Sequence, residues 1–317
     1  MTLDLRHRKA LRIGGQLVLL AVIAWYVYQS LAKGVAQSNF ASLRFDWRWL
    51  LASWMLLAGY YAVYTLGLDL IMRTLGSPST YPKAFKLNFA SNLGKYVPGG
   101  FWPALGRVAL APSMSLSRAH AAVSLVLEAG LSTAGGLIVF ALSLAFGGTL
   151  PKGTEPWQWV VLAVVLVVCL HPAIFRRALG AAFRVARVKQ EAPSLSYPVT
   201  LGLVALYAVS WLVAGAAFLA FSHAIVADAT GNVLQYAGAY AAASVAGLVV
   251  LFAPGGIGVR EGVLAVLITP LVGPGNAVIV GFAARVWSTL LELVLSGAAL
   301  AMPSPGGDAV SDEIRGS

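Results

Sequence analysis

The sequence predicts an all-α polytopic membrane protein with about seven transmembrane helices, one or two re-entrant helical hairpins and an inverted internal repeat. Of its 317 residues, 59% are hydrophobic and only 11% are charged, and the mean hydropathy is +0.79. Soluble domains carry about 25% charged residues, so this composition is unsuited to a water-exposed surface. The apolar residues form continuous blocks of about 20, the length of a transmembrane helix, and lack the alternation of a β-barrel.

The distribution of charge supports the same fold class. The formal net charge is +10, and the basic residues lie largely beside the apolar blocks. This is the pattern of the positive-inside rule, so it indicates a multi-pass protein of the bacterial cytoplasmic (inner) membrane and argues against nucleic acid as a partner. We expect a cytoplasmic N-terminus. The strongest cytoplasmic signal is the loop 175–198, with Arg176, Arg177, Arg184, Arg187 and Lys189.

The apolar blocks define seven expected spans within a single transmembrane domain, residues 1–302. Aromatic and basic residues mark their ends, as at Trp49 and Arg73 around the second span. The segment 303–317 is rich in Gly, Pro and Asp and is expected to be a disordered tail. The expected spans are about Ile13–Leu31, Trp49–Met72, Ala119–Phe146, Trp157–Ile174, Val199–Phe221, Val233–Phe252 and Asn276–Ala301.

The segment Lys83–Ala111 is predicted to be a re-entrant hairpin. If the N-terminus and the loop 175–198 are both cytoplasmic, this segment must begin and end on the cytoplasmic side. It is broken in the middle by Pro98, Gly99 and Gly100. Each half has about a dozen residues, too few to cross about 30 Å of hydrocarbon at 1.5 Å per residue. Proline and glycine favour a helix break at this point.

A second break of the same kind suggests an internal repeat. Pro254, Gly255 and Gly256 follow another apolar stretch. A charged residue then occurs at nearly equal distance within the next span, Glu128 being 30 residues after Pro98 and Arg285 being 31 after Pro254. Interrupted segments at matching positions in two halves are typical of transporter substrate sites.

The repeat units are expected at about 49–148 and 199–301. If Val233–Ile268 is also a hairpin, it enters from the outer face and the two repeats have inverted topology. The sequence leaves this open, because Val233–Phe252 is long enough to span the membrane fully.

Charged residues inside the spans are the candidates for chemistry, because a charge at the bilayer centre costs about 3 kcal/mol or more. Arginine suits bidentate phosphate binding and lysine supplies a point charge, so the cations predict an anion site near mid-membrane. Alternatively, Glu128, Glu261 and Glu292 form structural ion pairs with the arginines, and both interpretations can hold. The candidate substrate-binding residues are Lys95, Arg107, Glu128, Arg260, Glu261 and Arg285.

Two stretches resemble one known family. The first reads SNLGKYVPG from Ser91 to Gly99, with Arg107 downstream and Glu128 in the next expected span, and the second reads APGGIGVREG from Ala253 to Gly262. Both are similar to the lysyl-phosphatidylglycerol synthase transmembrane region family, and the resemblance covers most of the chain. It implies flippase-like translocation of a lipid headgroup between leaflets.

The resemblance does not extend to synthase activity. Full-length synthases of this family carry a soluble C-terminal aminoacyltransferase domain, whereas only the segment 303–317 follows the last expected span here. The chain is therefore expected to be a stand-alone member. Its cargo is left open between a membrane phospholipid and a polyprenyl-phosphate lipid.

Three functions remain in view from the sequence. The first is a lipid translocase that moves an anionic phospholipid or lipid-linked headgroup through a central cavity of broken helices. The second is an integral-membrane transferase with Glu128 or Glu261 as general base. The third is a membrane scaffold for a partner enzyme, such as a synthase or glycosyltransferase. The histidines are scattered and no catalytic or ATPase motif occurs, so we expect no enzyme activity, no cofactor and no metal. A homodimer is left open.

Overall fold

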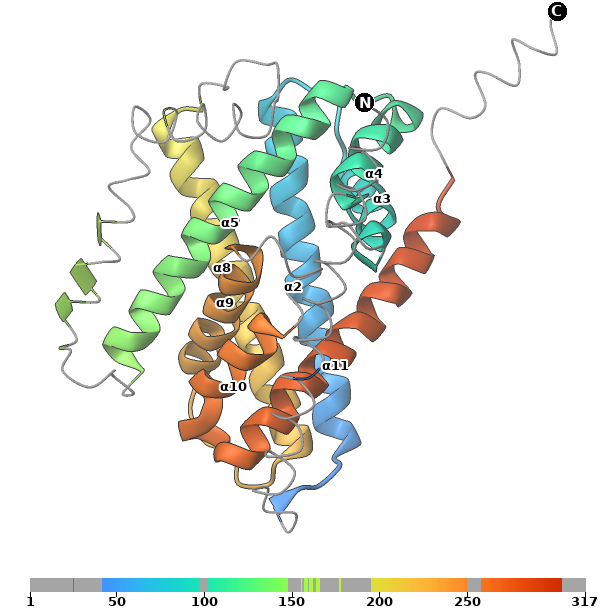
Figure 1. Ribbon diagram of the computed structural model, residues 1–317. Coiled ribbons are helices and arrows are strands. Elements are labelled where there is room, and N and C mark those ends of the chain that lie inside the picture. Colours follow the sequence, from blue (N-terminus) through green and yellow to red (C-terminus); the bar gives the residue numbers. More distant parts are fainter. Residues whose placement is uncertain are drawn as a thin grey trace, which may run out of the picture.

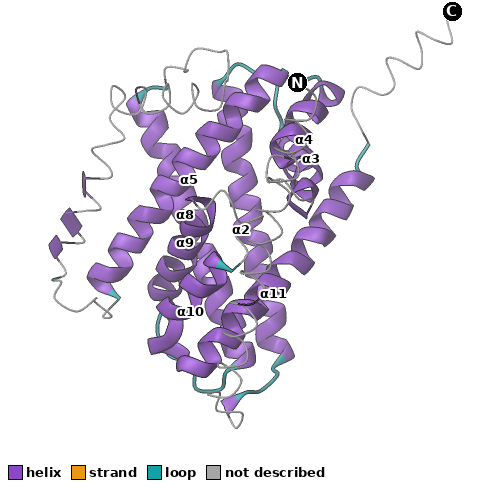
Figure 2. Cartoon of the chain, viewed as in Figure 1, coloured by secondary structure: helices purple, strands orange, loops and turns teal. Residues whose placement is uncertain are grey.

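The computed structural model describes residues 42–96, 102–147, 195–249 and 258–303, with Trp25 and scattered positions between 155 and 177. Apart from one isolated β-bridge between Leu43 and Val226, every regular element in these ranges is helical (Figure 2). The all-α prediction is confirmed. The expected spans Ile13–Leu31 and Trp157–Ile174, and the tail beyond Pro303, lie outside the described ranges.

Four long helices form the frame of the molecule (Figure 1). Each has 28 or 29 residues and is apolar enough to cross a membrane. At 1.5 Å per residue they are about 42 Å long, which exceeds the hydrocarbon thickness. They match four of the expected spans to within a few residues. They are α2 (Trp47–Thr74), α5 (Arg118–Phe146), α8 (Tyr197–Ile225) and α11 (Pro274–Ala301).

The ends of these helices follow from local sequence. Asp46 caps α2, its side chain accepting a hydrogen bond of 2.9 Å from the backbone N–H of Arg48. Ser117 caps α5 in the same way, with the N–H of His120 as donor at 3.4 Å. Such caps satisfy backbone donors that have no partner within the helix. Prolines near the first turn begin α8 and α11, where a missing N–H costs nothing.

The first hairpin follows α2 and returns to the same end of the bundle. It comprises α3 (Tyr81–Asn92), the 3₁₀ turn η2 (Leu93–Tyr96), α4 (Trp102–Leu110) and a second 3₁₀ turn η3 (Ala111–Met114). Ala84 near its start and Met114 at its end belong to one buried cluster with Met72 of α2. With 12 and 9 residues, α3 and α4 are about 18 and 14 Å long, too short to span. The expected re-entrant shape is therefore confirmed, while Pro98, Gly99 and Gly100 lie outside the described residues.

The second hairpin consists of α9 (Val233–Val249) and α10 (Val259–Val272). Thr230, just before α9, donates from its backbone N–H to the carbonyl of Leu271 at the end of α10 at 3.0 Å. The two helices are therefore antiparallel. With 17 and 14 residues they are about 26 and 21 Å long, shorter than about 30 Å of hydrocarbon, so their described lengths favour a hairpin over two full spans. Pro254, Gly255 and Gly256 lie outside the described residues.

The two hairpins open toward opposite ends of the bundle (Figure 1). The first joins the C-terminal end of α2, as its contact with Met72 shows. The second lies near the N-terminal end of α2, because Asn276, just after α10, donates to the Ser42 hydroxyl at 3.0 Å. This is the inverted arrangement that the sequence left open. The boundaries of the two repeat units stay a prediction.

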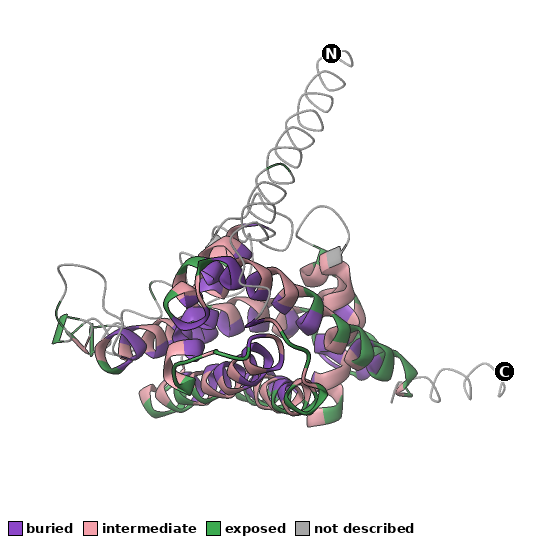
Figure 3. Cartoon of the chain, turned by 90° about the horizontal axis from the view of Figure 1, so that it is seen from below, coloured by how far each residue is buried: buried purple, intermediate pink, exposed green. Residues whose placement is uncertain are grey.

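Figure 3 shows the buried residues mainly toward the middle of the bundle and the exposed ones mainly on its outside, which is called the rim below. The rim is apolar along the long helices, as expected of a surface in contact with lipid. On α11 it includes Val286, Leu290 and Val294, which are 61%, 48% and 66% exposed. The core between α8, α9 and α11 is aromatic, with Phe218 close to Tyr240 and to Trp287.

Close helix packing depends on glycine at the contact of α8 and α9. A Cβ atom at Gly215 would lie 2.5 Å from the Cα of Ala237, which is backbone and cannot move aside. Small residues let membrane helices approach in this way, and they compensate for the weak hydrophobic drive between helices in lipid.

Gly215→Ala is therefore expected to lower the free energy of unfolding by about 1–3 kcal/mol, because the methyl group overpacks the contact. The measurement is thermal unfolding of the purified protein in mild detergent. Gly202→Ala is the control, since it lies in the same helix and a Cβ atom at that position would meet no other atom within 4 Å. Equal midpoints for the two variants would contradict the packing argument.

Candidate functional site

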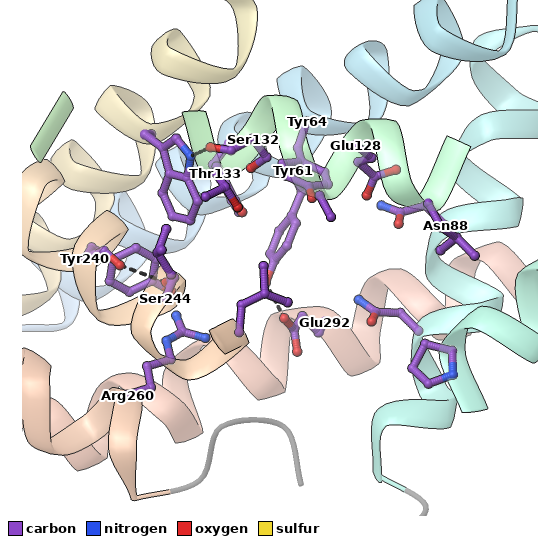
Figure 4. Close-up of a pocket in the computed structure, with 18 of the residues that line it drawn as sticks. Tyr61, Tyr64, Asn88, Glu128, Ser132, Thr133, Tyr240, Ser244, Arg260 and Glu292 are labelled. Carbon is purple, nitrogen blue, oxygen red and sulfur yellow. Dashed lines mark hydrogen bonds between the residues drawn. The ribbon is translucent and has the colours of Figure 1, made fainter. Parts of the chain in front are cut away.

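A cavity of about 360 Å³ lies between the long helices and the two hairpins. Helices α2, α3, α4, α5, α8, α9, α10 and α11 all contribute to its wall. Figure 4 shows the polar side chains converging on this space from several helices. The volume falls within the range of small-molecule sites, about 300–1,000 Å³.

The first charged group of the cavity is a buried ion pair between α4 and α5. Arg107 donates from Nη1 to Glu128 at 2.7 Å and from Nη2 to the second carboxylate oxygen at 3.4 Å. Nη2 also donates to the side-chain oxygen of Asn88 on α3 at 3.0 Å. Arg107 and Glu128 are only 5% and 7% exposed. The planar guanidinium thus binds both hairpin helices to α5 in one arrangement.

A second charged group joins the tip of the first hairpin to α11. Lys95 of η2 donates to Glu292 Oε2 in a short ion pair. The hydroxyl of Tyr61, from α2, donates to the other carboxylate oxygen of Glu292 at 2.6 Å. Three separate segments of the chain therefore meet at one carboxylate, which also lines the cavity.

Arg260 enters the cavity from the start of α10. Its guanidinium lies over the ring of Tyr240, 4.7 Å from the ring centroid, in a cation–π contact. No carboxylate among the described residues lies within salt-bridge distance of it. Figure 4 shows Tyr240 and Ser244 on the same side of the cavity as Arg260.

Glu261 and Arg285 lie behind Arg260 and are not part of the cavity wall. Glu261 accepts a hydrogen bond of 2.7 Å from the backbone N–H of Gly258 and so caps α10. Arg285 Nε is 3.9 Å from the other oxygen of Glu261. The structural ion pair that the sequence left open is thus the arrangement found at this position.

The structure therefore brings together three of the six candidate residues, namely Arg107, Glu128 and Arg260. Lys95 reaches the same space through Glu292. Sequence reasoning treated Glu292 only as a pairing carboxylate, and it missed the aromatic part of the wall. A signal was present, since several tyrosines interrupt an apolar span near its middle. The missed cavity residues with polar groups include Tyr60, Tyr61, Tyr64, Asn88, Trp211, Tyr240 and Ser244.

Within the described ranges, no group of three or more His, Cys, Asp or Glu side chains is arranged to hold a metal ion. The polar atoms of the cavity are instead guanidinium, carboxylate, amide and hydroxyl groups. These groups bind anions and hydroxyls through hydrogen bonds.

Breaking the Arg107–Glu128 pair on one side is expected to cost about 3–5 kcal/mol, because Glu128→Gln leaves a buried guanidinium without a counter-charge. The double variant Arg107→Met/Glu128→Gln removes both charges and is expected to recover much of that loss. Chemical unfolding in detergent measures both. A double variant no more stable than Glu128→Gln alone would show that the pair is not what stabilises this contact.

No match to this chain is found among curated proteins. A family model does match, and it covers residues 13–296, which include every residue given above as lining the cavity. The matched family is described as the lysylphosphatidylglycerol synthase TM region. The stretches Ser91–Gly99 and Ala253–Gly262 already resembled this family, and the apolar helices agree with a multi-pass membrane protein. The chain therefore belongs to the lysylphosphatidylglycerol synthase transmembrane-region family.

Proposed function

We propose that this protein is a lipid translocase, which moves an anionic phospholipid or lipid-linked headgroup between the two leaflets. The observation that supports this most directly is the polar cavity inside a lipid-facing bundle. Charges in that position are costly and are typically found along substrate pathways. A sealed, apolar core would instead favour a scaffold.

The position of the cavity between two inverted hairpins fits this role. Residues of the first hairpin, such as Arg107, and of the second, such as Arg260, both line it. Each hairpin leads from the cavity toward a different end of the bundle (Figure 1). A headgroup held in the cavity would therefore have one route to each leaflet, as in transporters built from inverted repeats.

The lipid tails need not enter the cavity. Its wall includes Leu248, which is 54% exposed at the surface of the bundle, and Val245 and Leu125 nearby. These apolar side chains lie between the polar interior and the surrounding lipid. The headgroup would occupy the cavity while the acyl or polyprenyl chains stay in the bilayer.

The ion pairs supply the groups that must rearrange during transport. Lys95–Glu292 holds the first hairpin to α11, and Arg107–Glu128 holds it to α5. A bound anion can take over donors from these carboxylates and so change which contacts hold the hairpin. The sequence has no ATPase motif, so transport would be downhill or coupled to an ion gradient.

The same contacts make the transferase a weaker proposal. Glu128 already accepts two hydrogen bonds from Arg107, and Glu261 caps a helix outside the cavity. A general base needs a carboxylate within reach of the proton that it removes. We accordingly propose a transporter and not an enzyme, working beside a synthase or glycosyltransferase that makes the cargo.

We further propose that the protein lies in the bacterial inner membrane with the open end of the first hairpin in the cytoplasm. That end carries Arg73, Lys83 and Arg118, in accordance with the positive-inside rule. The N-terminus is then cytoplasmic as well.

Single cysteines test this orientation. In a Cys169→Ser background, Ser113→Cys at the end of the first hairpin is expected to react with an impermeant thiol reagent only after cells are opened. Asp228→Cys, at the opposite end and also exposed, should react in intact spheroplasts. Labelling of both from the same side would contradict the inverted hairpins.

Transport itself is measured by headgroup accessibility in proteoliposomes. Fluorescent phosphatidylglycerol, its lysyl form and a polyprenyl phosphate are tested separately, with and without pH and sodium gradients. The wild-type protein should move at least one of them, and Arg260→Ala should slow that movement about tenfold or more, because it removes hydrogen bonds to a charged group.

Arg118→Ala is the matched control, because it removes an exposed arginine at the start of α5 and leaves the cavity unchanged. It should transport at the wild-type rate. Absence of protein-dependent movement for every lipid under every gradient would refute the translocase.

A further inference from the structure

The charges in the interior of the bundle do not balance. Between the two ends of the helix bundle, the described residues include four cations and three carboxylates. The carboxylates Glu128, Glu261 and Glu292 each lie beside one cation, as described above. Among the described residues, one positive charge of the interior is therefore left without a carboxylate beside it. The four cations are Lys95, Arg107, Arg260 and Arg285.

The geometry assigns this excess charge to Arg260. It is the cation that faces the cavity with an aromatic ring as its partner instead of a carboxylate. A cation–π contact of this kind is worth only about 0.5–2 kcal/mol, far less than the cost of removing the charge from water. An anion bound in the cavity would compensate it.

The rest of the cavity wall offers neutral polar groups. No hydrogen bond joins the hydroxyls of Tyr60, Tyr64 and Tyr240, or the side chain of Thr133, to another residue in the described ranges. All four residues line the cavity. Tyrosine and threonine hydroxyls can both donate and accept, which suits the hydroxyls of a ligand.

From this charge balance we infer that the cavity selects a lipid phosphodiester with a single negative charge and an uncharged, hydroxyl-bearing headgroup. Arg260 binds the phosphodiester, and the tyrosine and threonine hydroxyls bind the headgroup. A glycerol ester of a phospholipid and a hexose ester of a polyprenyl phosphate share this chemistry. The inference rests on the proposed function, since it names the cargo of the same cavity.

The same count of charges indicates which lipid headgroups should bind poorly. A phosphomonoester carries a charge of about −1.5 to −2, which exceeds the single positive charge of Arg260, the interior cation that has no carboxylate partner among the described residues. A zwitterionic headgroup brings a cation for which every carboxylate in the cavity is already paired. A lysyl-bearing headgroup carries a net positive charge and would add to the excess.

Binding at equilibrium tests the inference without transport. The purified full chain in detergent is mixed with lipids, and retained lipid is counted by native mass spectrometry. Phosphatidylglycerol, phosphatidylethanolamine, lysyl-phosphatidylglycerol and phosphatidic acid carry the same acyl chains, and a polyprenyl phosphohexose is tested beside them. Phosphatidylglycerol or the phosphohexose, or both, should be retained about tenfold better than the other three lipids. Whichever of these two lipids is retained better shows whether the cargo carries acyl chains or a polyprenyl chain.

Two substitutions remove the free charge in different ways. Arg260→Gln should abolish the preference while the protein stays folded, because the side chain borders the cavity. Ser244→Asp leaves Arg260 in place but adds a carboxylate on the same side of the cavity, and it should abolish the preference as well (Figure 4). Ser113→Asp is the control, because it adds a carboxylate at an exposed position outside the cavity, and it should keep the preference.

Retention of phosphatidylethanolamine, lysyl-phosphatidylglycerol or phosphatidic acid as strong as that of the monoanions would overturn the inference. So would an unchanged preference in Arg260→Gln, or retention of no lipid. The two proposals fail separately. A chain that binds monoanions selectively but moves no lipid refutes the translocase alone, and a chain that moves lipids regardless of charge refutes the selectivity alone.

Discussion

Hydrocarbon offers no hydrogen-bond partner to a backbone amide or a charged side chain, and the structure is organised around that constraint. Helices satisfy the backbone, and the long helices α2, α5, α8 and α11 do so across the membrane. The short helices of the two hairpins pack against the long helices. The charges are handled in the same way, each carboxylate of the interior lying beside a cation. The exception is Arg260, which faces the cavity and has no carboxylate beside it among the described residues.

The interior contacts also hold together segments that are distant in the chain. Tyr61 and Glu292 are 231 residues apart, and Lys95 and Glu292 are 197 apart. Removing either partner of such a contact affects the hairpin, the long helix and the cavity wall together. Some of the polar groups that hold the helices together, such as Glu292, are thus the same groups that line the cavity.

Much of the fold could be predicted from sequence, because span length and charge asymmetry act locally. The breaks at Pro98 and Pro254 predicted one hairpin and suggested the other. The second hairpin could not be settled, since α9 alone has 17 residues, close to the length of a span. The short partner helix favours the hairpin, because α10 has only 14 residues, and its end at Val272 is not marked by any loss of hydrophobicity in the sequence.

The site was less predictable, for physical reasons that differ between residues. Glu261 looked like a ligand because it is charged and buried, but its position three residues after Gly258 makes it a helix cap. Glu292 pairs with a lysine from the other half of the chain, and no local pattern shows this. Tyr60 and Tyr64 resemble core aromatics in sequence, and only the arrangement of helices shows that they face a cavity.

Helix α11 contacts both hairpins, and this has a mechanical consequence. It contacts the first hairpin through Glu292 and through Ser296, whose hydroxyl donates to the carbonyl of Phe89 at 3.0 Å. It contacts the second hairpin through Arg285. Its outer side is apolar and would face lipid, and fluid lipid opposes movement of a helix less than tightly packed protein side chains do. A tilt of α11 would therefore displace both hairpins at once, and the parts of the cavity wall that they form would move together.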